Sequence, residues 1–228
     1  MNETRYRYAL SDPHGCQDVL EQALAAIDLT EDDCLYLLGD YIPHQPYNMD
    51  NDKFFARCGE SLAYVRGLQR RLGERVCVLR GNHELALLDR ADAGMIELPV
   101  PVERWLRRLP AVVENDQQIF VHAGIDEEAG PWWRLGYEDW YFCSKFPATF
   151  GSYDKDIIAG HVGAPSLVGD DSFEGAFWDG ASHYYIDGST ELTGRITVLR
   201  YSVVRGTYDQ RIVTARDAGP WEPIEANA

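Results

Sequence analysis

The stretch Val76-Cys77-Val78-Leu79-Arg80-Gly81-Asn82-His83-Glu84 decides how the chain is interpreted, because an apolar run ends abruptly in glycine and polar residues. Such a run is typical of a buried strand, and the residues after it stand at the carboxyl end of that strand. Residues 84–90 are interpreted as a short helix. Asn82 and His83 are therefore expected at a helix N-terminus, where an anion is favoured.

The same design recurs in four other places. Apolar runs lead into Ser11-Asp12-Pro13-His14-Gly15, Gly39-Asp40, His122-Ala123-Gly124 and Gly160-His161. In an open α/β sheet, ligands gather outside the carboxyl ends of the strands, so these endings predict one convergent site in an α/β fold. The candidate residues are Asp12, His14, Asp40, Asn82, His83, His122 and His161.

The residue types at these positions indicate a metal site. A single histidine after an apolar run is more often a core or surface residue than a ligand. Four of the 6 histidines share this context here, together with two aspartates and an asparagine, which reverses that expectation. Imidazole and carboxylate ligands suit divalent Mn, Fe, Zn or Co, and the near-absence of paired cysteines at the strand ends argues against a thiolate zinc site.

Composition narrows the class of protein. The 228 residues suffice for one sizeable core, and we expect a single domain over residues 1–216 and a loosely tied tail at 217–228. A net charge of -16 argues against a protein that mainly grips a nucleic-acid backbone, whereas bound dications would still admit small anionic substrates. The 5 cysteines and a start without an apolar secretory segment predict a reduced, cytoplasmic setting, and no apolar run suggests a membrane span.

Other segments are interpreted from their periodicity. Residues 15–27 and 54–72 show helical spacing of apolar residues, and residues 41–52 form a linker-like loop. Residues 184–186 and 196–201 are predicted to be strands in a hairpin-like arrangement of an antiparallel second sheet. The aromatic-rich residues 124–153 are interpreted either as a cap packed on the core or as a lid or substrate wall.

These residues predict a particular chemistry. Two metals can clamp the attacking and leaving oxygens of an in-line displacement and ionise a bridging water near neutral pH, which indicates hydrolysis of a phosphate ester or anhydride. Asp40 is the natural bridging ligand, because a carboxylate has two oxygens. Asp12 and His14 complete one metal in this hypothesis, and Asn82, His122 and His161 complete the other. His83 is left to donate a proton to the leaving group.

In this order, the motifs quoted above resemble those of the calcineurin-like metallophosphoesterases. The resemblance is to the phosphoprotein phosphatase branch, which includes bacterial Ser/Thr phosphatases and symmetrical diadenosine tetraphosphate hydrolases. It covers residues 6–201 and implies a four-layer α-β-β-α sandwich of two mixed sheets, with the ligand roles just assigned.

The sequence departs from the family pattern at one motif. Family members continue from Gly-Asp to Asp-Arg-Gly, whereas this chain has Pro43-His44-Gln45. The resemblance implies the loss of the carboxylate that orients His83 and of an arginine that grips phosphate. Asp50 or Asp52 is a hypothetical replacement for the carboxylate, and His44 or Arg134 for the clamp. Phe142 stands where bacterial relatives often carry a further arginine.

We therefore expect a hydrolase of a phosphate monoester or nucleotide-like phosphoanhydride that uses two divalent metal ions. Manganese is the expected metal, with Fe, Zn, Co or Ni as alternatives. The substrate is a phosphorylated small molecule or a phosphoprotein. The alternative is a catalytically weak or inactive metal-binding regulatory module of the same fold.

Overall fold

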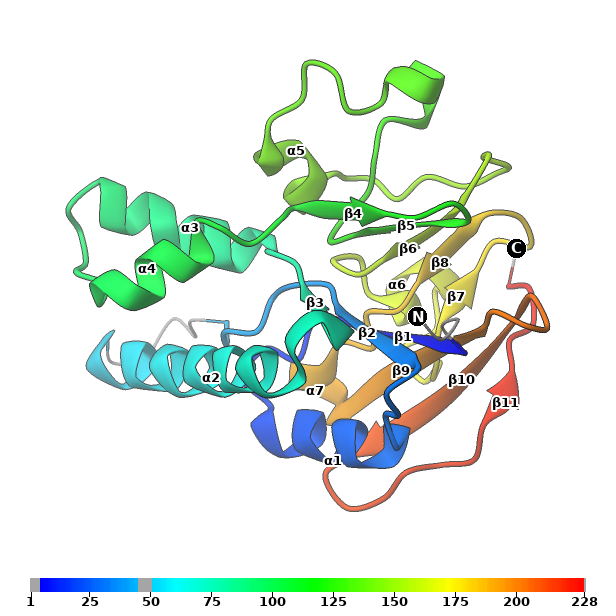
Figure 1. The fold of residues 1–228 in the computed structure, drawn as a ribbon, viewed down its shortest axis with the longest axis horizontal. Coiled ribbons are helices and arrows are strands. Elements are labelled where there is room, and N and C mark those ends of the chain that lie inside the picture. Colours follow the sequence, from blue (N-terminus) through cyan, green and yellow to red (C-terminus); the bar gives the residue numbers. More distant parts are fainter. Residues whose placement is uncertain (1–4, 45–50, 228) are drawn as a thin grey trace.

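The computed structural model describes residues 5–44 and 51–227, shown in Figure 1. The strands are β1 (Tyr6–Leu10), β2 (Asp33–Leu37), β3 (Val76–Val78), β4 (Val112–Glu114), β5 (Gln118–Val121), β6 (Asp156–Ala159), β7 (Phe177–Trp178), β8 (His183–Tyr185), β9 (Arg195–Ser202), β10 (Thr207–Thr214) and β11 (Glu222–Pro223). The helices are α1 (Gln17–Ile27), α2 (Asn51–Leu72), η1 (Gly73–Arg75), α3 (Asn82–Asp92), α4 (Val100–Leu106), η2 (Glu127–Trp132), α5 (Asp139–Ser144), α6 (Ala164–Val168) and α7 (Thr190–Thr193).

The strands form two mixed sheets. The 6-stranded sheet has the order β11-β10-β9-β1-β2-β3, and the 5-stranded sheet has the order β4-β5-β6-β8-β7. Strands β1, β2 and β3 run parallel, as do β5, β6 and β8, while the remaining pairs are antiparallel. Each sheet therefore has a parallel half whose carboxyl ends can present loop residues to a common site.

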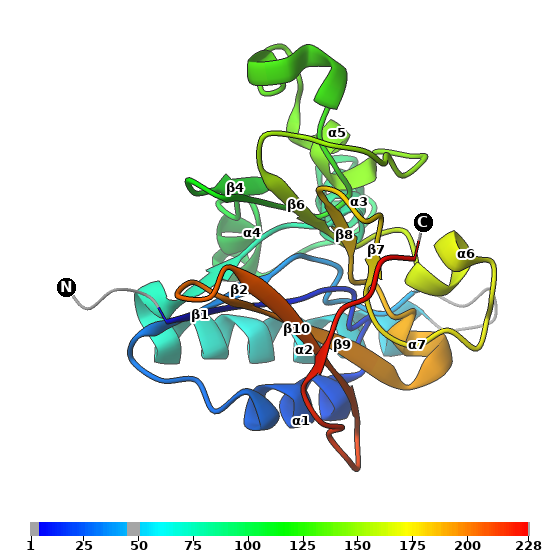
Figure 2. The ribbon, with the colours of Figure 1, turned by 90° about the vertical axis from the view of Figure 1, so that its right-hand side faces the viewer.

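Three apolar clusters define four layers. One lies between the sheets and includes Leu79, which directly follows β3 of the first sheet, and Ile158 of the second sheet, both fully buried. A second packs α1 and α2 against the outer face of the first sheet, and a third packs α5 and α6 against the second sheet. The views in Figures 1 and 2 show α1 and α2 on the outer side of the first sheet and α5 beyond the second. The predicted four-layer sandwich is confirmed.

Helix α2 shows why the periodic stretches become helices. Its buried residues Phe54, Cys58, Leu62, Val65 and Leu68 recur every three or four positions, so one face of the helix meets the sheet. Burying a leucine of this stripe contributes roughly 1.5–3 kcal/mol. The helix begins at Asn51, three residues before the predicted start, and Asp52 lies exposed in its first turn. Asp50 lies outside the described residues, as does Gln45.

Two sequence-based expectations about the C-terminal third are wrong. The predicted hairpin does not form, because β8 pairs with β6 and β7 in one sheet while β9 pairs with β1 and β10 in the other. The segment predicted to be loosely tied adds an edge strand, with Glu222 opposite Gln210, and Trp221 packs against the core. Alternation of apolar residues identified these strands but carries no information on which partner completes each sheet.

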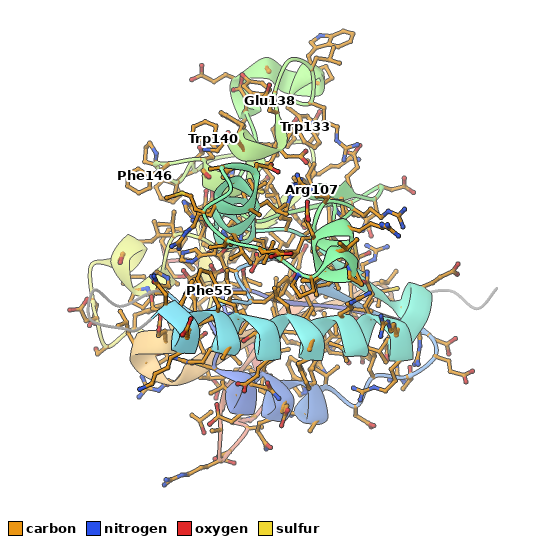
Figure 3. All side chains as sticks on the ribbon, turned by 90° about the vertical axis from the view of Figure 1, so that its left-hand side faces the viewer. Phe55, Arg107, Trp133, Glu138, Trp140 and Phe146 are labelled. Atoms are coloured by element: carbon orange, nitrogen blue, oxygen red, sulfur yellow. The ribbon has the colours of Figure 1, made fainter. Side chains whose placement is uncertain are left out.

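The aromatic segment forms a cap over the second sheet. Trp133 and Phe142 are buried and meet edge to face at 5.7 Å between ring centroids. Trp140 and Phe146 instead point outward, with 65% and 75% of their surface exposed (Figure 3). Phe142 is thus a core residue of the cap. No helix among residues 5–44 and 51–227 is long and apolar enough to cross a bilayer.

Candidate metal centre

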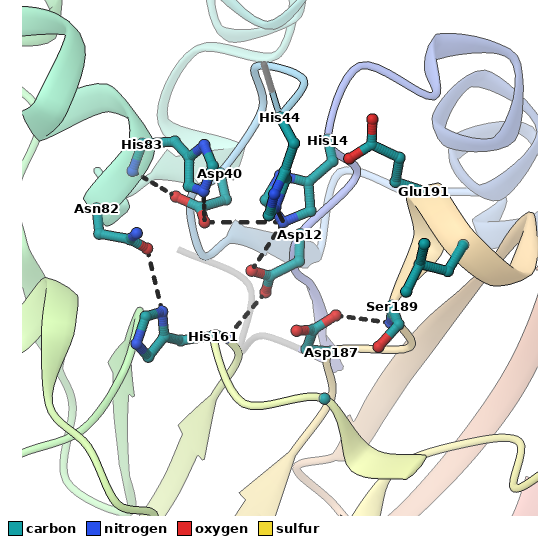
Figure 4. A pocket seen from close by; sticks show the side chains of 12 residues that line it. Asp12, His14, Asp40, His44, Asn82, His83, His161, Asp187, Ser189 and Glu191 are labelled. Atoms are coloured by element: carbon teal, nitrogen blue, oxygen red, sulfur yellow. Dashed lines mark hydrogen bonds and ion pairs between the residues drawn. The ribbon is translucent and has the colours of Figure 1, made fainter. Parts of the chain in front are cut away.

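The candidate residues come together at the carboxyl ends of the parallel strands. Asp12 and His14 follow β1, and Asp40 follows β2. Asn82 and His83 form the first turn of α3 after β3, while His122 and His161 follow β5 and β6 of the other sheet. The centre therefore lies where the two sheets meet, and each sheet contributes part of it (Figure 4).

The backbone at these positions is unusual. Asp12, His14, Asp40 and His161 all have positive φ angles, of 53°, 42°, 55° and 66°. Side-chain-bearing residues avoid this left-handed region, and each such residue costs roughly 1–3 kcal/mol unless its surroundings hold it there. Concentration of this conformation on four candidate residues is typical of a functional site.

One set of potential ligands consists of Asp40, His122 and His161, whose ligating atoms lie within 4.8 Å of one another. His122 directs Nδ1 at the carbonyl oxygen of Leu38, at 2.9 Å, so its Nε2 faces the centre. That Nε2 lies 3.4 Å from Oδ2 of Asp40.

The amide oxygen of Asn82 joins this set. It lies 2.8 Å from Nε2 of His122 and 3.1 Å from Nδ1 of His161. The hydrogen bond from His122 to the Leu38 carbonyl defines the tautomer that leaves a lone pair for a cation. The lone pairs of Asp40, Asn82, His122 and His161 therefore converge on one region.

A second set consists of Asp12, His14 and Asp40. Nε2 of His14 lies 3.8 Å from both Oδ1 of Asp12 and Oδ2 of Asp40. Oδ2 of Asp12 accepts from Ser11 Oγ and from the His161 N–H, but the buried Oδ1 has no hydrogen-bond partner in the described part of the chain. A buried carboxylate oxygen without a partner is costly, and a cation at this position would satisfy it. The residues present thus fit a metal.

The protonation states of His14 and His161 agree with this interpretation. Burial lowers the pKa of His14 and of His161 to about 4, so both imidazoles are neutral at neutral pH, the form that ligates. At His122, burial lowers the pKa, but the carboxylates of Asp40 and Asp12 outweigh it and raise that pKa to about 10, so a bound cation would have to displace the His122 proton. Burial also raises the pKa of Asp12, and the neighbouring charges of Asp187 and Asp40 add to the effect. Burial would raise the pKa of Asp40 too, but the imidazole of His122 outweighs it and keeps that pKa low. Crowded carboxylates of this kind are stabilised by a bound cation.

Two glycines make room for the carboxylates. A Cβ atom on Gly81 would lie 2.1 Å from Oδ1 of Asp40, and a Cβ atom on Gly160 would lie 2.1 Å from Oδ2 of Asp12. Carbon and oxygen atoms do not approach this closely, so only glycine fits at either position.

Glu84 is a positioning residue that the sequence analysis missed. Its side chain is fully buried and accepts backbone N–H groups of Asp40 at 2.8 Å, Tyr41 at 2.9 Å, Ile42 at 3.3 Å and Gly81 at 3.0 Å. It occupies the third position of α3, where a glutamate can reach back to the helix start. A glutamate at the third position of a helix, directly after Gly-Asn-His, was the sequence signal that could have identified Glu84.

The potential ligands open onto a cavity of about 370 Å³. Its lining comprises Asp12, His14, Asp40, His44, Asn82, His83, His161, Gly163, Asp187, Ser189, Glu191 and Leu192. The described lining contains no lysine or arginine. Arg134 lies elsewhere, paired with Glu114 at 3.5 Å and stacked on Trp133. Asp52 is not among these lining residues either.

Asp187 was also missed by the sequence analysis. Its buried carboxylate accepts the Ser189 N–H at 2.7 Å, and burial raises its pKa to about 6. The apolar run before it ends in Asp187-Gly188, the same pattern as the other strand endings. Interpretation of that run as part of a hairpin concealed the signal.

His83 and His44 line the same cavity. Nε2 of His83 lies 3.8 Å from Oδ2 of Asp40, the one carboxylate within 4.0 Å of it in the described part of the chain. Nε2 of His44 lies 3.2 Å from Nε2 of His14.

One family profile matches most of the chain. The family profile "Calcineurin-like phosphoesterase" matches residues 8–203, which run from within β1 to just past β9 and include every candidate ligand. The chain belongs to this family. In this calcineurin-like phosphoesterase, the potential ligands lie at the strand ends of a two-sheet sandwich.

Curated relatives of this phosphoesterase include symmetrical bis(5'-nucleosyl)-tetraphosphatases. The one from Salmonella paratyphi C is 32% identical over 145 residues, covering 56% of this chain and 45% of the relative. The one from Vibrio parahaemolyticus is 30% identical over 142 residues, covering 56% and 46%. In these alignments the phosphoesterase matches slightly less than half of each relative's length.

Solved structures share the fold. A candidate diadenosine tetraphosphatase superimposes with a TM-score of 0.64 at 20% identity, covering 93% of this chain and 95% of that one. A protein serine/threonine phosphatase from Saccharomyces cerevisiae superimposes with a TM-score of 0.59 at 10% identity, covering 97% and 84%. At these identities the likeness shows the fold of the phosphoesterase alone.

Proposed function

We propose that this chain is a dinuclear-metal-dependent hydrolase of a phosphate monoester or a nucleotide-like phosphoanhydride. The observation that carries the proposal is the buried Oδ1 of Asp12, which faces His14 without a hydrogen-bond partner among the described residues. No contact within the described chain satisfies this oxygen, and a cation ligand would do so.

Asp12, His14 and Asp40 would hold one cation, and Asp40 would share the other with Asn82, His122 and His161. When bound, two such cations neutralise charge on a phosphate and lower the pKa of a water molecule towards neutrality. The mixed oxygen and imidazole ligands suit Mn²⁺ first, with Fe, Zn, Co or Ni as alternatives.

His83 supplies the proton in this proposal. Its ring lines the cavity, and burial lowers its pKa, which makes its protonated form a stronger acid. As the bond between phosphorus and the leaving oxygen breaks, His83 gives its proton to that oxygen. Glu84 positions Asp40 by accepting its backbone N–H.

Dinucleoside polyphosphates are the first substrate class to test, because the curated relatives are named for one of them. The described lining of the cavity lacks a guanidinium clamp, so recognition of phosphate would depend on the cations and on imidazoles such as His44. A phosphopeptide is the second class, since the fold is shared with a protein phosphatase.

The test is turnover by the purified protein with Mn²⁺ on an aryl phosphate, a phosphopeptide and diadenosine tetraphosphate. We expect Asp40→Asn to abolish turnover and His83→Ala to reduce it at least roughly a hundredfold, the typical contribution of a general acid. Asp89→Asn, an exposed change on the same helix as His83, is the matched control and should leave turnover unchanged.

Two outcomes would contradict the proposal. Equal turnover of the wild type and His83→Ala on an alkyl phosphate, whose poor leaving group requires protonation, would remove the acid role. Absence of turnover on every substrate in a protein that binds two Mn²⁺ ions would favour a metal-binding regulatory module instead.

A further inference from the structure

Three histidine rings from separate segments converge at the cavity. His14 follows β1, His44 follows β2, and His83 lies in the first turn of α3. The ring centroids are 4.1 Å apart for His14 and His44, 4.3 Å for His44 and His83, and 4.9 Å for His14 and His83. One ring nitrogen of each lies within 4.8 Å of one in both others (Figure 4).

The backbone holds two of these rings together. The His14 N–H donates to the carbonyl oxygen of Asp40 at 3.0 Å, and the Gly15 N–H donates to that of Tyr41 at 2.9 Å. A Cβ atom on Gly15 would lie only 3.1 Å from Pro43, so the two loops are in close contact. His44 is therefore carried over His14 by a fixed pair of loops, which lowers the entropy cost of binding one ion with both rings.

The ring of His14 is oriented to ligate. Its Nδ1 faces the carbonyl oxygen of Ile42 at 3.3 Å, which leaves the lone pair on Nε2. The Nε2 atom of His44 lies 3.2 Å from it, the separation expected for two nitrogens that bind one zinc ion at about 2.1 Å each. Three imidazoles and an open fourth position are a ligand set that zinc accepts in proteins.

The geometry points to a separate all-imidazole zinc site formed by His14, His44 and His83, whose occupation competes with the dinuclear centre for His14. Nε2 of His14 also lies 3.8 Å from Asp12 and from Asp40, and one lone pair binds one cation. Metals that favour imidazole, such as Zn²⁺, would take the three histidines, whereas Mn²⁺ favours the carboxylate-containing set.

Occupation of this site would inhibit the enzyme. Zinc bound by His14, His44 and His83 withdraws one ligand from the dinuclear centre and occupies the proposed proton donor. The inhibitory consequence rests on the function proposed above, but the zinc site itself does not. The chain would thus respond to zinc through His44, which lines the cavity beside His14.

The test locates metals directly. Crystals of the wild type soaked with Mn²⁺ and Zn²⁺ are measured above and below the zinc and manganese absorption edges. We expect a zinc peak between the rings of His14, His44 and His83. In solution, His44→Ala should bind zinc at this site at least tenfold more weakly by titration calorimetry, and His44→Cys, which restores a soft ligand, should recover the binding.

The outcomes separate this inference from the proposed function. Manganese at the dinuclear centre with no zinc peak between the three histidines would overturn the inference and leave the proposed function standing. Zinc binding of equal affinity in the wild type and His44→Ala would also overturn it. No metal in either place would overturn both. Weaker zinc inhibition of turnover in His44→Ala than in the wild type would support the inhibitory role.

Discussion

The carboxylate of Glu84 accepts the backbone N–H of Asp40 at 2.8 Å, although 44 positions separate the two residues in the chain. The same carboxylate accepts three further backbone N–H groups around Asp40. One buried acidic group of α3 therefore holds the turn that carries Asp40, the proposed shared metal ligand. The proposed metal centre therefore depends on Glu84, which is not among the residues that line the cavity.

Replacement of Glu84 by glutamine should weaken metal binding. The side-chain amide cannot match the acceptor capacity of the carboxylate, so at least one buried N–H loses its partner. We expect metal affinity to fall roughly 10- to 100-fold and the free energy of unfolding to fall by about 1–3 kcal/mol. Calorimetric metal titration and urea denaturation measure the two effects. Asp89→Asn, on the exposed face of α3, is the control, and an equal response in both variants would contradict the prediction.

Gly81→Ala and Gly160→Ala should each disrupt the metal centre. The new methyl group would lie 2.1 Å from Asp40 or Asp12, so the carboxylate must leave its position. We expect loss of one or both metals, measured by elemental analysis after dialysis. Gly59→Ala is the matched control, because a methyl group there meets nothing within 4 Å in the middle of α2. That change should raise stability by roughly 0.4–1 kcal/mol. Retention of both metals in Gly81→Ala would show that the turn adapts.

Removal of metal should destabilise the fold. Asp12, Asp40 and Asp187 are buried carboxyl groups near one another, and a bound cation offsets their mutual repulsion. At a Mn²⁺ concentration 100 times the dissociation constant, binding adds about 2.7 kcal/mol per site. Thermal unfolding with and without a chelator measures the difference. The difference in melting temperature should be absent in the double variant Asp12→Asn/Asp40→Asn. A melting temperature of the wild type that does not change when the chelator is added would contradict this prediction.

The attachment of the cap should weaken in acid. Lys145 Nζ lies 2.5 Å from Oε2 of Glu127, and Nε2 of His183 lies 3.2 Å from its Oε1. Burial would raise the pKa of Glu127, but these hydrogen bonds outweigh it and hold the pKa below the ordinary value of 4.5. A lowered folded-state pKa stabilises above the unfolded-state pKa, and the stabilisation is lost as the pH falls through the folded-state value.

Hydrogen exchange of residues 127–150 between pH 6 and pH 3 measures this loss. Protection should decrease below about pH 4.5 in the wild type. Glu127→Gln should show low protection across the whole range, whereas Glu128→Gln, an exposed neighbour, should behave as the wild type. Protection in Glu127→Gln that still falls with pH as in the wild type would assign the acid sensitivity to another group.

Local sequence determined the strand endings and the side chains that they deliver. A strand ending can be recognised in the sequence as an apolar run followed by glycine and a polar residue, because the backbone leaves the sheet where the buried side chains end. Asp12, Asp40, Asn82, His122 and His161 were predicted to converge on this basis, and the structure brings them together. The fold class followed from the same pattern and from the resemblance that these motifs carry.

Tertiary structure alone decided which strands pair and which side chains reach the cavity. β9 lies beside β1 through pairs that are far apart in the chain, such as Tyr6 and Ser202, and apolar alternation cannot specify such a partner. His44 reaches His14 while Arg134 stacks on Trp133, because loop conformation and not residue type sets where a side chain lies. Glu84 acts through backbone groups that are distant in the chain, and such partners exist only once the sheets are assembled.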